Sequence, residues 1–288
     1  MVFVIHNKNI FLMFMVLLSI NSCNHYEVKS ISSPKIQNII QKHYINPKKS
    51  LDTYSNLLDY NQSKRLRQSL ESLDEKALFT LMLENKLLYV RIKKFNQNID
   101  LLLREVLFKY YRDTKGIIID LRDNPGGLLL KAICISNFFV NNGVLLKTVG
   151  KNKNDIDIYY AKKSHLISRV PIVIIVNERS ISASEVLAGI LQDKNRAIVI
   201  GRKTYGKGNI QDLISVSRDR ILKLTTGKYY FSSGKSIDNI GILPDIEIQE
   251  KKIVIHKTLA SSLRYDIMKL KIKNRDLNLL VAKMLLLY

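Results

Sequence analysis

The chain has 288 residues, 46% of them hydrophobic and 25% charged, so it is long enough to bury a core and too apolar to be disordered. Its two cysteines exclude a disulfide framework and a cysteine-rich zinc module. The formal net charge of +21 allows a nucleic-acid or anionic-membrane partner, but the basic residues are scattered and rarely form runs. We therefore expect a weak preference for anionic surfaces and no specific nucleic-acid site.

The first 22 residues have the layout of a secretory signal. Lys8 precedes an unbroken apolar run over residues 10–18 (IFLMFMVLL), which is too short to span a bilayer, and small or polar residues follow it. Ser22 stands directly before Cys23, an arrangement that resembles a bacterial lipobox, in which the cysteine is acylated and becomes the new N-terminus. We expect residues 1–22 to be a signal peptide, Cys23 to be lipidated, and the protein to lie in a bacterial periplasm or at the cell surface. A plain cleaved signal and an uncleaved anchor are the alternatives.

The next part of the chain is predicted to be a tether followed by helices. Residues 23–33 are polar and are expected to form the tether. In residues 34–86, apolar side chains recur at helical spacing, first from Pro34 and again over 62–83. This pattern predicts an N-terminal helical region.

Residues 87–250 are predicted to form an α/β core. Apolar runs of the kind expected for strands buried on both faces alternate with helical segments, which implies parallel βαβ units. The expected strands are 87–92, 116–121, 171–176 and 197–200, and the expected helices are 99–112, 128–140 and 183–193.

The pattern changes beyond Gly208. Residues 209–216 and 220–231 flank a polar turn and predict an antiparallel hairpin. Residues 251–288 form a basic C-terminal region, in which the spacing of apolar side chains over 257–288 predicts a pair of helices.

Two loops follow the carboxyl ends of predicted parallel strands, where sites form in open α/β sheets. They are residues 122–127, which contain Gly126 and Gly127, and residues 177–182. A helix is expected to start directly after each loop, so each loop carries the positive end of a helix dipole. The glycines let backbone N–H groups approach a ligand. The sequence therefore predicts a site for an anion, or for the oxyanion that develops during acyl transfer.

Ser182 stands at the start of the second of these helices. With Glu185 it forms an S-x-x-E capping box, which is a purely structural explanation, and Ser180 and Ser184 compete with it for any chemical role. An exposed serine at a helix start after a buried strand is also where hydrolases present a nucleophile, although the G-x-S-x-G elbow is absent here. The residues alone leave both interpretations open.

A nucleophilic serine needs a base. No histidine of this chain stands in a recognisable triad arrangement, whereas burial can lower the pKa of a lysine toward neutrality. Lys207 is the candidate, because it lies between Gly206 and Gly208 and follows the last predicted parallel strand. The alternative is an ordinary turn lysine.

Four segments in order resemble the carboxyl-terminal processing proteases, the tail-specific serine peptidases of the S41 type. The resemblance runs from about Leu87 to Ile248, and it implies a fold related to the crotonase type: a parallel-sheet core with an antiparallel β segment, plus N- and C-terminal helices. The segments that carry it are 116–131 (GIIIDLRDNPGGLLLK), 172–193 (IVIIVNERSISASEVLAGILQD), 201–211 (GRKTYGKGNIQ) and 224–245 (LTTGKYYFSSGKSIDNIGILPD).

The resemblance also implies the roles of the site residues. Ser182 would be the nucleophile, Lys207 the general base, and Gln211 the residue that hydrogen-bonds and orients the lysine. The oxyanion hole would be formed by backbone N–H groups of Gly126, Gly127 and Ala183. No metal or cofactor is expected.

Proteins of this family often carry a PDZ domain between their N-terminal helices and the core. Tyr60 and Tyr89 are only about 30 residues apart here, which is far below domain size, so we expect no PDZ domain. The expected function is that of an exported Ser-Lys endopeptidase that hydrolyses peptide bonds in extracytoplasmic proteins and is held to a membrane by a lipid anchor. The sequence leaves open whether the protein forms a homo-oligomer. The alternatives are a degenerate protease fold that acts as a binding or scaffold protein, and a basic surface protein that binds nucleic acid or anionic lipid.

Overall fold

The computed structural model describes residues 55–58, 77–151, 155–163, 169–217, 220–249, 252–270 and 276–288. The predicted signal peptide, Cys23, the tether and most of the 34–86 region lie outside the described residues. No helix in these ranges is long and apolar enough to cross a membrane.

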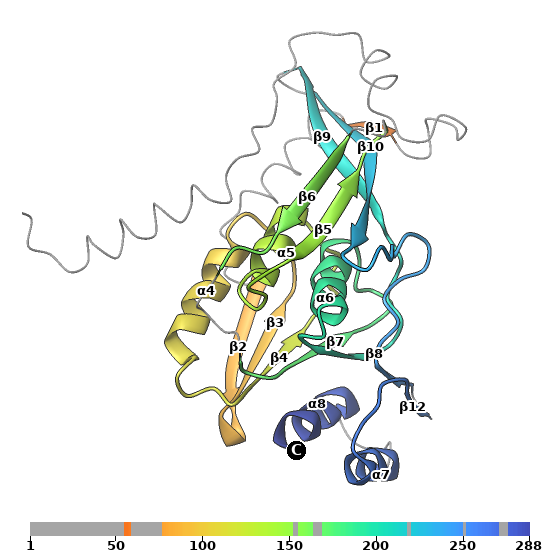
Figure 1. The fold of residues 1–288 in the computed structure, drawn as a ribbon. Coiled ribbons are helices and arrows are strands. Elements are labelled where there is room, and N and C mark those ends of the chain that lie inside the picture. The colour runs from red at the N-terminus through yellow and green to blue at the C-terminus, as the bar shows by residue number, and fades with distance from the viewer. Residues whose placement is uncertain are drawn as a thin grey trace, which may run out of the picture.

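A seven-stranded sheet forms the centre of the described chain (Figure 1). Its five inner strands are parallel and its two edge strands are antiparallel, which confirms the predicted parallel-sheet core. In spatial order the strands are β12 (Ile253–Ile255), β11 (Ile246–Ile248), β8 (Ile198–Gly201), β7 (Ile172–Val176), β4 (Gly116–Asp120), β3 (Leu87–Ile92) and β2 (Leu78–Leu83).

Helices cover both faces of this sheet, which is why the inner strands are apolar throughout. Along β4, Ile117 and Ile119 point into one hydrophobic cluster and Ile118 points into the other. The first cluster contains side chains of α4 (Ile99–Tyr110), α5 (Leu129–Ser136) and α6 (Ala183–Asp193). The second contains side chains of the C-terminal helices α7 (Ser261–Lys269) and α8 (Leu277–Leu287), which lie on the opposite side of the sheet (Figure 1).

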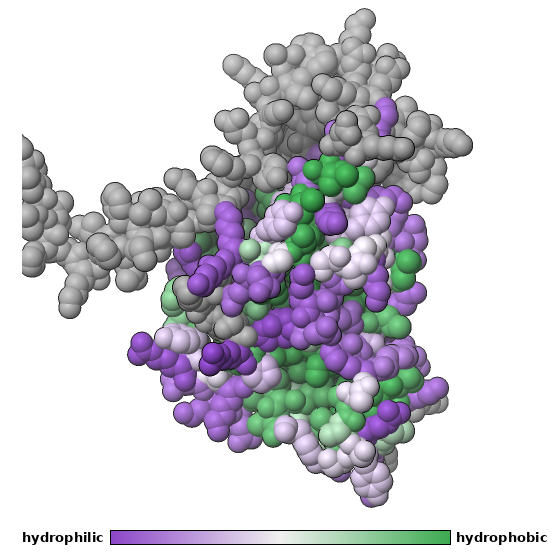
Figure 2. Space-filling view, viewed as in Figure 1, coloured by the Kyte–Doolittle hydropathy of each residue, from purple (hydrophilic) through white to green (hydrophobic). Residues whose placement is uncertain are grey.

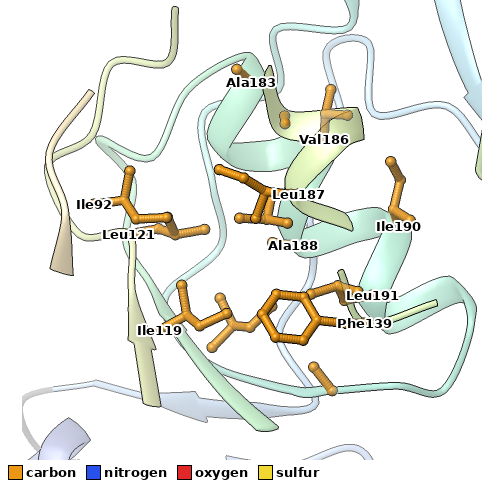
Figure 3. Close-up of a cluster of buried hydrophobic side chains, with 14 of the residues drawn as sticks. Ile92, Ile119, Leu121, Phe139, Ala183, Val186, Leu187, Ala188, Ile190 and Leu191 are labelled. Carbon is orange, nitrogen blue, oxygen red and sulfur yellow. The ribbon is translucent and has the colours of Figure 1, made fainter. Parts of the chain in front are cut away.

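Helix α6 is buried on nearly all sides because it lies between two sheets. Its residues Leu187 and Leu191 pack in the cluster that contains Ile119 of β4 (Figure 3). On another side, a Cβ built on Gly189 would lie 2.1 Å from the ring of Phe231 in the second sheet. Glycine at this position therefore lets the second sheet pack directly on the helix backbone.

The second sheet is antiparallel. Its strands are β1 (Ser55–Leu58), β10 (Arg220–Phe231), β5 (Val144–Val149) and β6 (Ile156–Tyr160), with β9 (Asn209–Ser217) paired to β10. The predicted hairpin is the β9–β10 pair, which extends away from the core in Figure 1.

The predicted N-terminal helical region is wrong at two places. Residues 55–58 are strand β1, and residues 78–83 are strand β2, which a short 3₁₀ helix (Glu84–Lys86) joins to β3. The leucines at 78 and 81 are spaced as on a helix, but pairing of β2 with β3 extends the core sheet and overrides that local pattern. The rest of the 62–83 prediction lies outside the described residues.

The C-terminal region contains the two helices that the spacing predicts, and α8 is tied to a loop of the core. Asp276 accepts a hydrogen bond from Leu279 N–H at the start of α8, and it also binds Arg122 through two hydrogen bonds of 3.0 and 2.8 Å. Arg122 in turn binds the fully buried Asp120. Burial alone would lower the pKa of Arg122, but hydrogen bonds to Asp120 and Asp276 raise it, so the guanidinium stays charged.

We expect Asp276→Ala to destabilise the protein by about 2 kcal/mol, because it removes both a helix cap and one carboxylate of a partly buried ion pair. Asp113→Ala is the matched control, since Asp113 is exposed and lies 3.8 Å from Lys86. That control should change stability by less than about 0.5 kcal/mol. Urea denaturation measures both, and equal effects of the two substitutions would contradict the prediction.

Hydrophobic side chains also gather on the outer face around the C-terminal helices (Figure 2). Met268 and Tyr265 on α7 are 61% and 59% exposed, and Leu287 at the end of α8 is 50% exposed. The inner side of α8 is buried, with Val281 and Ala282 fully enclosed.

Candidate active site

Ser182 occupies a strained position directly before α6. Its backbone has φ 59° and ψ −115°, a conformation that L-residues rarely adopt outside functional turns. Gly126 of the other predicted loop lies against it, because a Cβ on Gly126 would come within 3.0 Å of the Ser182 Cβ and 2.5 Å of the Ile181 oxygen. The structure therefore brings the two predicted loops into contact at Ser182.

Of the three candidate serines, Ser182 is the accessible one. Ser180 is fully buried and its hydroxyl donates to the Leu121 carbonyl. Ser184 is also fully buried and its hydroxyl donates to the Asn124 carbonyl. Ser182 is half-buried. Of the three, Ser182 alone therefore has the exposure that a nucleophile needs.

Asn124 joins the two loops. Its side-chain amide donates to the Ile92 carbonyl at 2.8 Å, and its Oδ1 accepts from the Gly126 N–H at 2.8 Å. Its backbone carbonyl accepts from the Ile181 N–H at 3.0 Å as well as from Ser184. From sequence Asn124 was predicted only as part of a turn. In the structure this fully buried side chain fixes the glycine loop against the serine loop.

These hydrogen bonds reduce the number of backbone N–H groups that are available to form the predicted oxyanion hole. The Gly126 N–H already has an acceptor in Asn124, so it is not available to a ligand. The Gly126 carbonyl accepts from Phe95 N–H at 2.9 Å. In a trans peptide the next N–H points the opposite way, so the Gly127 N–H projects away from Phe95. Within the described part of the chain, the N–H groups of Gly127 and Ala183 have no acceptor, and they stay the candidate donors.

A second set of contacts joins the outer rims of the same loops. Asp123 accepts hydrogen bonds from the side chains of Asn177 at 2.9 Å and Arg179 at 2.7 Å. The hydrogen bond from Asn177 is the largest influence on the pKa of Asp123. Together with Arg179 it lowers this pKa, although partial burial opposes the change. The carboxylate is therefore ionised at neutral pH and holds the rims together.

Glu185 connects the serine to the lysine. It is fully buried in the first turn of α6, and four donors surround its carboxylate. Oε1 accepts from the Thr204 hydroxyl and the Gly206 N–H, both at 2.6 Å. Oε2 accepts from the Ser182 N–H at 2.8 Å and from the Lys207 N–H at 3.0 Å. Because Oε2 accepts from both N–H groups, the backbone nitrogens of Ser182 and Lys207 lie no more than 5.8 Å apart.

Lys207 is held by contacts at both its backbone and its side chain. Its Nζ donates to Gln211 Oε1 at 2.9 Å, which is the contact that the sequence resemblance implies. Its carbonyl accepts a hydrogen bond from the hydroxyl of Tyr229, a buried residue of β10. Burial, followed by the charges of Glu185 and Asp238, raises the pKa of Tyr229, so this hydroxyl keeps its proton.

Comparison with known proteins identifies the family of this chain. The sequence profile described as peptidase family S41 matches residues 86–248, which is more than half of the chain. This chain belongs to peptidase family S41. The match begins one residue before the expected start of the core and ends where the sequence resemblance ends.

Several relatives of this S41 chain carry processing-protease names. It is 40% identical over 167 residues to a carboxy-terminal-processing protease of Bartonella bacilliformis, covering 56% of this chain and 38% of that protein. It is 32% identical over 161 residues to a chloroplastic C-terminal processing peptidase of Tetradesmus obliquus, covering 56% and 34%. The chain thus spans less than half the length of these two relatives.

Solved structures support the S41 fold. The photosystem II D1 C-terminal processing protease superposes with a TM-score of 0.52 at 28% identity, over 68% of this chain and 47% of that one. A lipoprotein from Streptococcus agalactiae superposes with a TM-score of 0.53 at 18% identity, over 86% of this chain and 94% of that one. The second likeness concerns the fold alone.

We expect Glu185→Gln to lower the free energy of unfolding by about 3 kcal/mol. A glutamine can accept from two of the four donors only, and its own N–H₂ group would face the other two in a buried site. Glu178→Gln is the matched control, because the Glu178 side chain is 54% exposed and lies 3.5 Å from Arg202. Urea denaturation measures stability in both. A Glu185→Gln protein as stable as the control would show that the four contacts contribute little.

Proposed function

We propose that this S41 protein is an exported, lipid-anchored serine endopeptidase of the carboxyl-terminal processing type that uses a Ser182–Lys207 dyad. The observation that carries the proposal is the Glu185 carboxylate, which accepts from the backbone N–H groups of both residues through one oxygen. An accessible serine in a strained turn and a lysine anchored beside it are what a serine–lysine mechanism requires. The expected substrates are proteins or peptides outside the cytoplasm.

In the proposed reaction, the Ser182 hydroxyl attacks a peptide carbonyl while its proton passes to an uncharged Lys207. The Gly127 and Ala183 N–H groups stabilise the resulting oxyanion, each by about 3–4 kcal/mol. Lys207 then donates the proton to the departing amine, and the C–N bond breaks to leave an acyl-enzyme. A water molecule attacks that ester while Lys207 takes its proton. Lys207 then returns the proton to the Ser182 oxygen as the acyl C–O bond breaks and the carboxylic acid product leaves.

Gln211 fits a role in orienting the base. Its Oε1 accepts a hydrogen bond from Lys207 Nζ at 2.9 Å. An uncharged amine needs its one lone pair aimed at the proton that it removes, and this contact restricts how the amine can rotate. Because Gln211 is itself neutral, it orients the amine without stabilising the charged form as strongly as a carboxylate would.

The test is to incubate the purified protein with an unfolded protein substrate and to map the fragments by mass. New fragments, together with covalent labelling of Ser182 by a fluorophosphonate, are expected. A protein that produces no fragments and takes no label, although it is folded, would be a binding or scaffold protein with a degenerate site. Fragments that map to one end of the substrate would support the tail-processing part of the proposal, and internal fragments alone would contradict it.

A further inference from the structure

The lysine loop has a second anchor that the sequence resemblance did not assign. Gly206 and Gly208 flank Lys207, and Gly206 has a φ of +95°, a backbone conformation that favours glycine. A Cβ on Gly206 would lie 3.0 Å from the Gly241 nitrogen, which shows how closely another loop approaches. The packing of this loop and the hydrogen bonds of its backbone therefore determine where Lys207 stands.

Two groups hold the Lys207 backbone, one at its N–H and one at its carbonyl. Glu185 on α6 accepts from the Lys207 N–H. Tyr229 on β10 donates its hydroxyl to the Lys207 carbonyl, and its own backbone N–H donates to the Gly208 carbonyl at 3.3 Å. The Tyr229 ring is 2% exposed, so it cannot swing away without disturbing the core. The same hairpin that supplies Tyr229 also supplies Gln211, which contacts Lys207 Nζ.

We propose that Tyr229 is a positioning residue for the base: its hydroxyl fixes the Lys207 backbone so that the amine stays between Gln211 and Ser182. This inference rests on the proposed function, because it assumes that Lys207 is the base. Tyr229 touches no reacting atom. Its contribution is to remove the freedom that the two flanking glycines would otherwise give to Lys207.

Tyr229→Phe tests the role with little change to the fold. Phenylalanine keeps the buried ring and the backbone bond to Gly208, and it removes only the hydroxyl. Tyr230→Phe is the matched control, because Tyr230 is the next residue of the same strand and is only half-buried. Wild type, both variants and Lys207→Ala are compared on one peptide substrate over a range of pH.

For Tyr229→Phe we expect kcat to fall about 10-fold or more with KM little changed, because substrate contacts are intact. We also expect the pH–rate profile of the variant to be displaced from that of wild type, since the amine that acts as the base is held less firmly. The charges that act on Tyr229 are those of Glu185 on α6 and Asp238, and Asp238 is paired with Lys228; all three residues are unchanged in the variant. Tyr230→Phe should behave as wild type.

A covalent serine reagent counts the competent molecules in each sample, so partial unfolding cannot be mistaken for a slower turnover. If Tyr229→Phe matches Tyr230→Phe in kcat and in pH profile while Lys207→Ala is inactive, the positioning role is wrong and the dyad stands. If Lys207→Ala keeps wild-type activity, the proposed function itself is wrong.

Discussion

Replacing Ser182 with alanine is expected to lower kcat/KM by about 10⁶-fold, the size of loss seen when the nucleophile of a serine protease is removed. The hydroxyl is the atom that forms the covalent bond, and nothing adjacent can replace it, because Ser180 and Ser184 are buried and donate to backbone carbonyls. The fold should survive, since the bond from the Ser182 backbone N–H to Glu185 is kept and the substitution removes only the side-chain half of the capping box.

Ser184→Ala provides the control for that substitution. It removes a hydroxyl two residues away, yet the Asn124 carbonyl keeps a second donor in the Ile181 N–H, so no buried acceptor is left unpaired. Activity should stay within about 10-fold of wild type. Peptide cleavage is followed by mass spectrometry of the fragments. A Ser182→Ala protein that still cuts at the wild-type rate would contradict the assignment of Ser182 as the nucleophile.

The second large effect is expected at the base. Lys207→Met keeps the length of the side chain and the backbone contacts to Glu185 and Tyr229, but it removes the proton acceptor. We expect a loss of about 10³–10⁴-fold in kcat, which is the contribution typical of general acid–base catalysis. The fold should survive, because a half-buried side chain is replaced by one of similar volume.

Lys207→Arg sharpens this test. Its guanidinium keeps the positive charge and donor capacity but stays protonated at every accessible pH, so it cannot accept the proton from Ser182. We expect Lys207→Arg to be as inactive as Lys207→Met. Wild-type kcat/KM should rise with pH as the general base loses its proton. Substantial activity in the arginine variant would mean that the lysine provides only charge.

The parallel core could be predicted from the sequence because its signals are local. Strands such as β4 and β7 are buried on both faces and are apolar without interruption, and each is followed by a glycine- or serine-containing loop and a helix. Strands β5 and β6 were not predicted. They are short, and β5 pairs with β10, which lies about 80 residues later in the chain, so their stability comes from contacts that a local pattern does not record.

The site was predicted mainly through the family resemblance. That resemblance implied the roles of Ser182, Lys207 and Gln211, and the structure has Lys207 Nζ donating to Gln211. Glu185 was visible only as a helix cap, since an S-x-x-E pattern gives no sign that the same carboxylate also binds residues about 20 positions later. The contact of Tyr229 with Lys207 could not be predicted from the sequence, because a tyrosine in a predicted strand is most simply interpreted as a core residue.

The contact between Arg122 and Asp276 bears on how small an active version of this protein can be. A fragment limited to residues 86–248 would contain the whole family match and every candidate catalytic residue, yet it would lack Asp276 and the helix that Asp276 caps. One face of the seven-stranded sheet would lose its helical cover, and the Arg122 guanidinium would lose one of its two carboxylate partners. We therefore expect the smallest catalytic unit to extend beyond the family match, through α8.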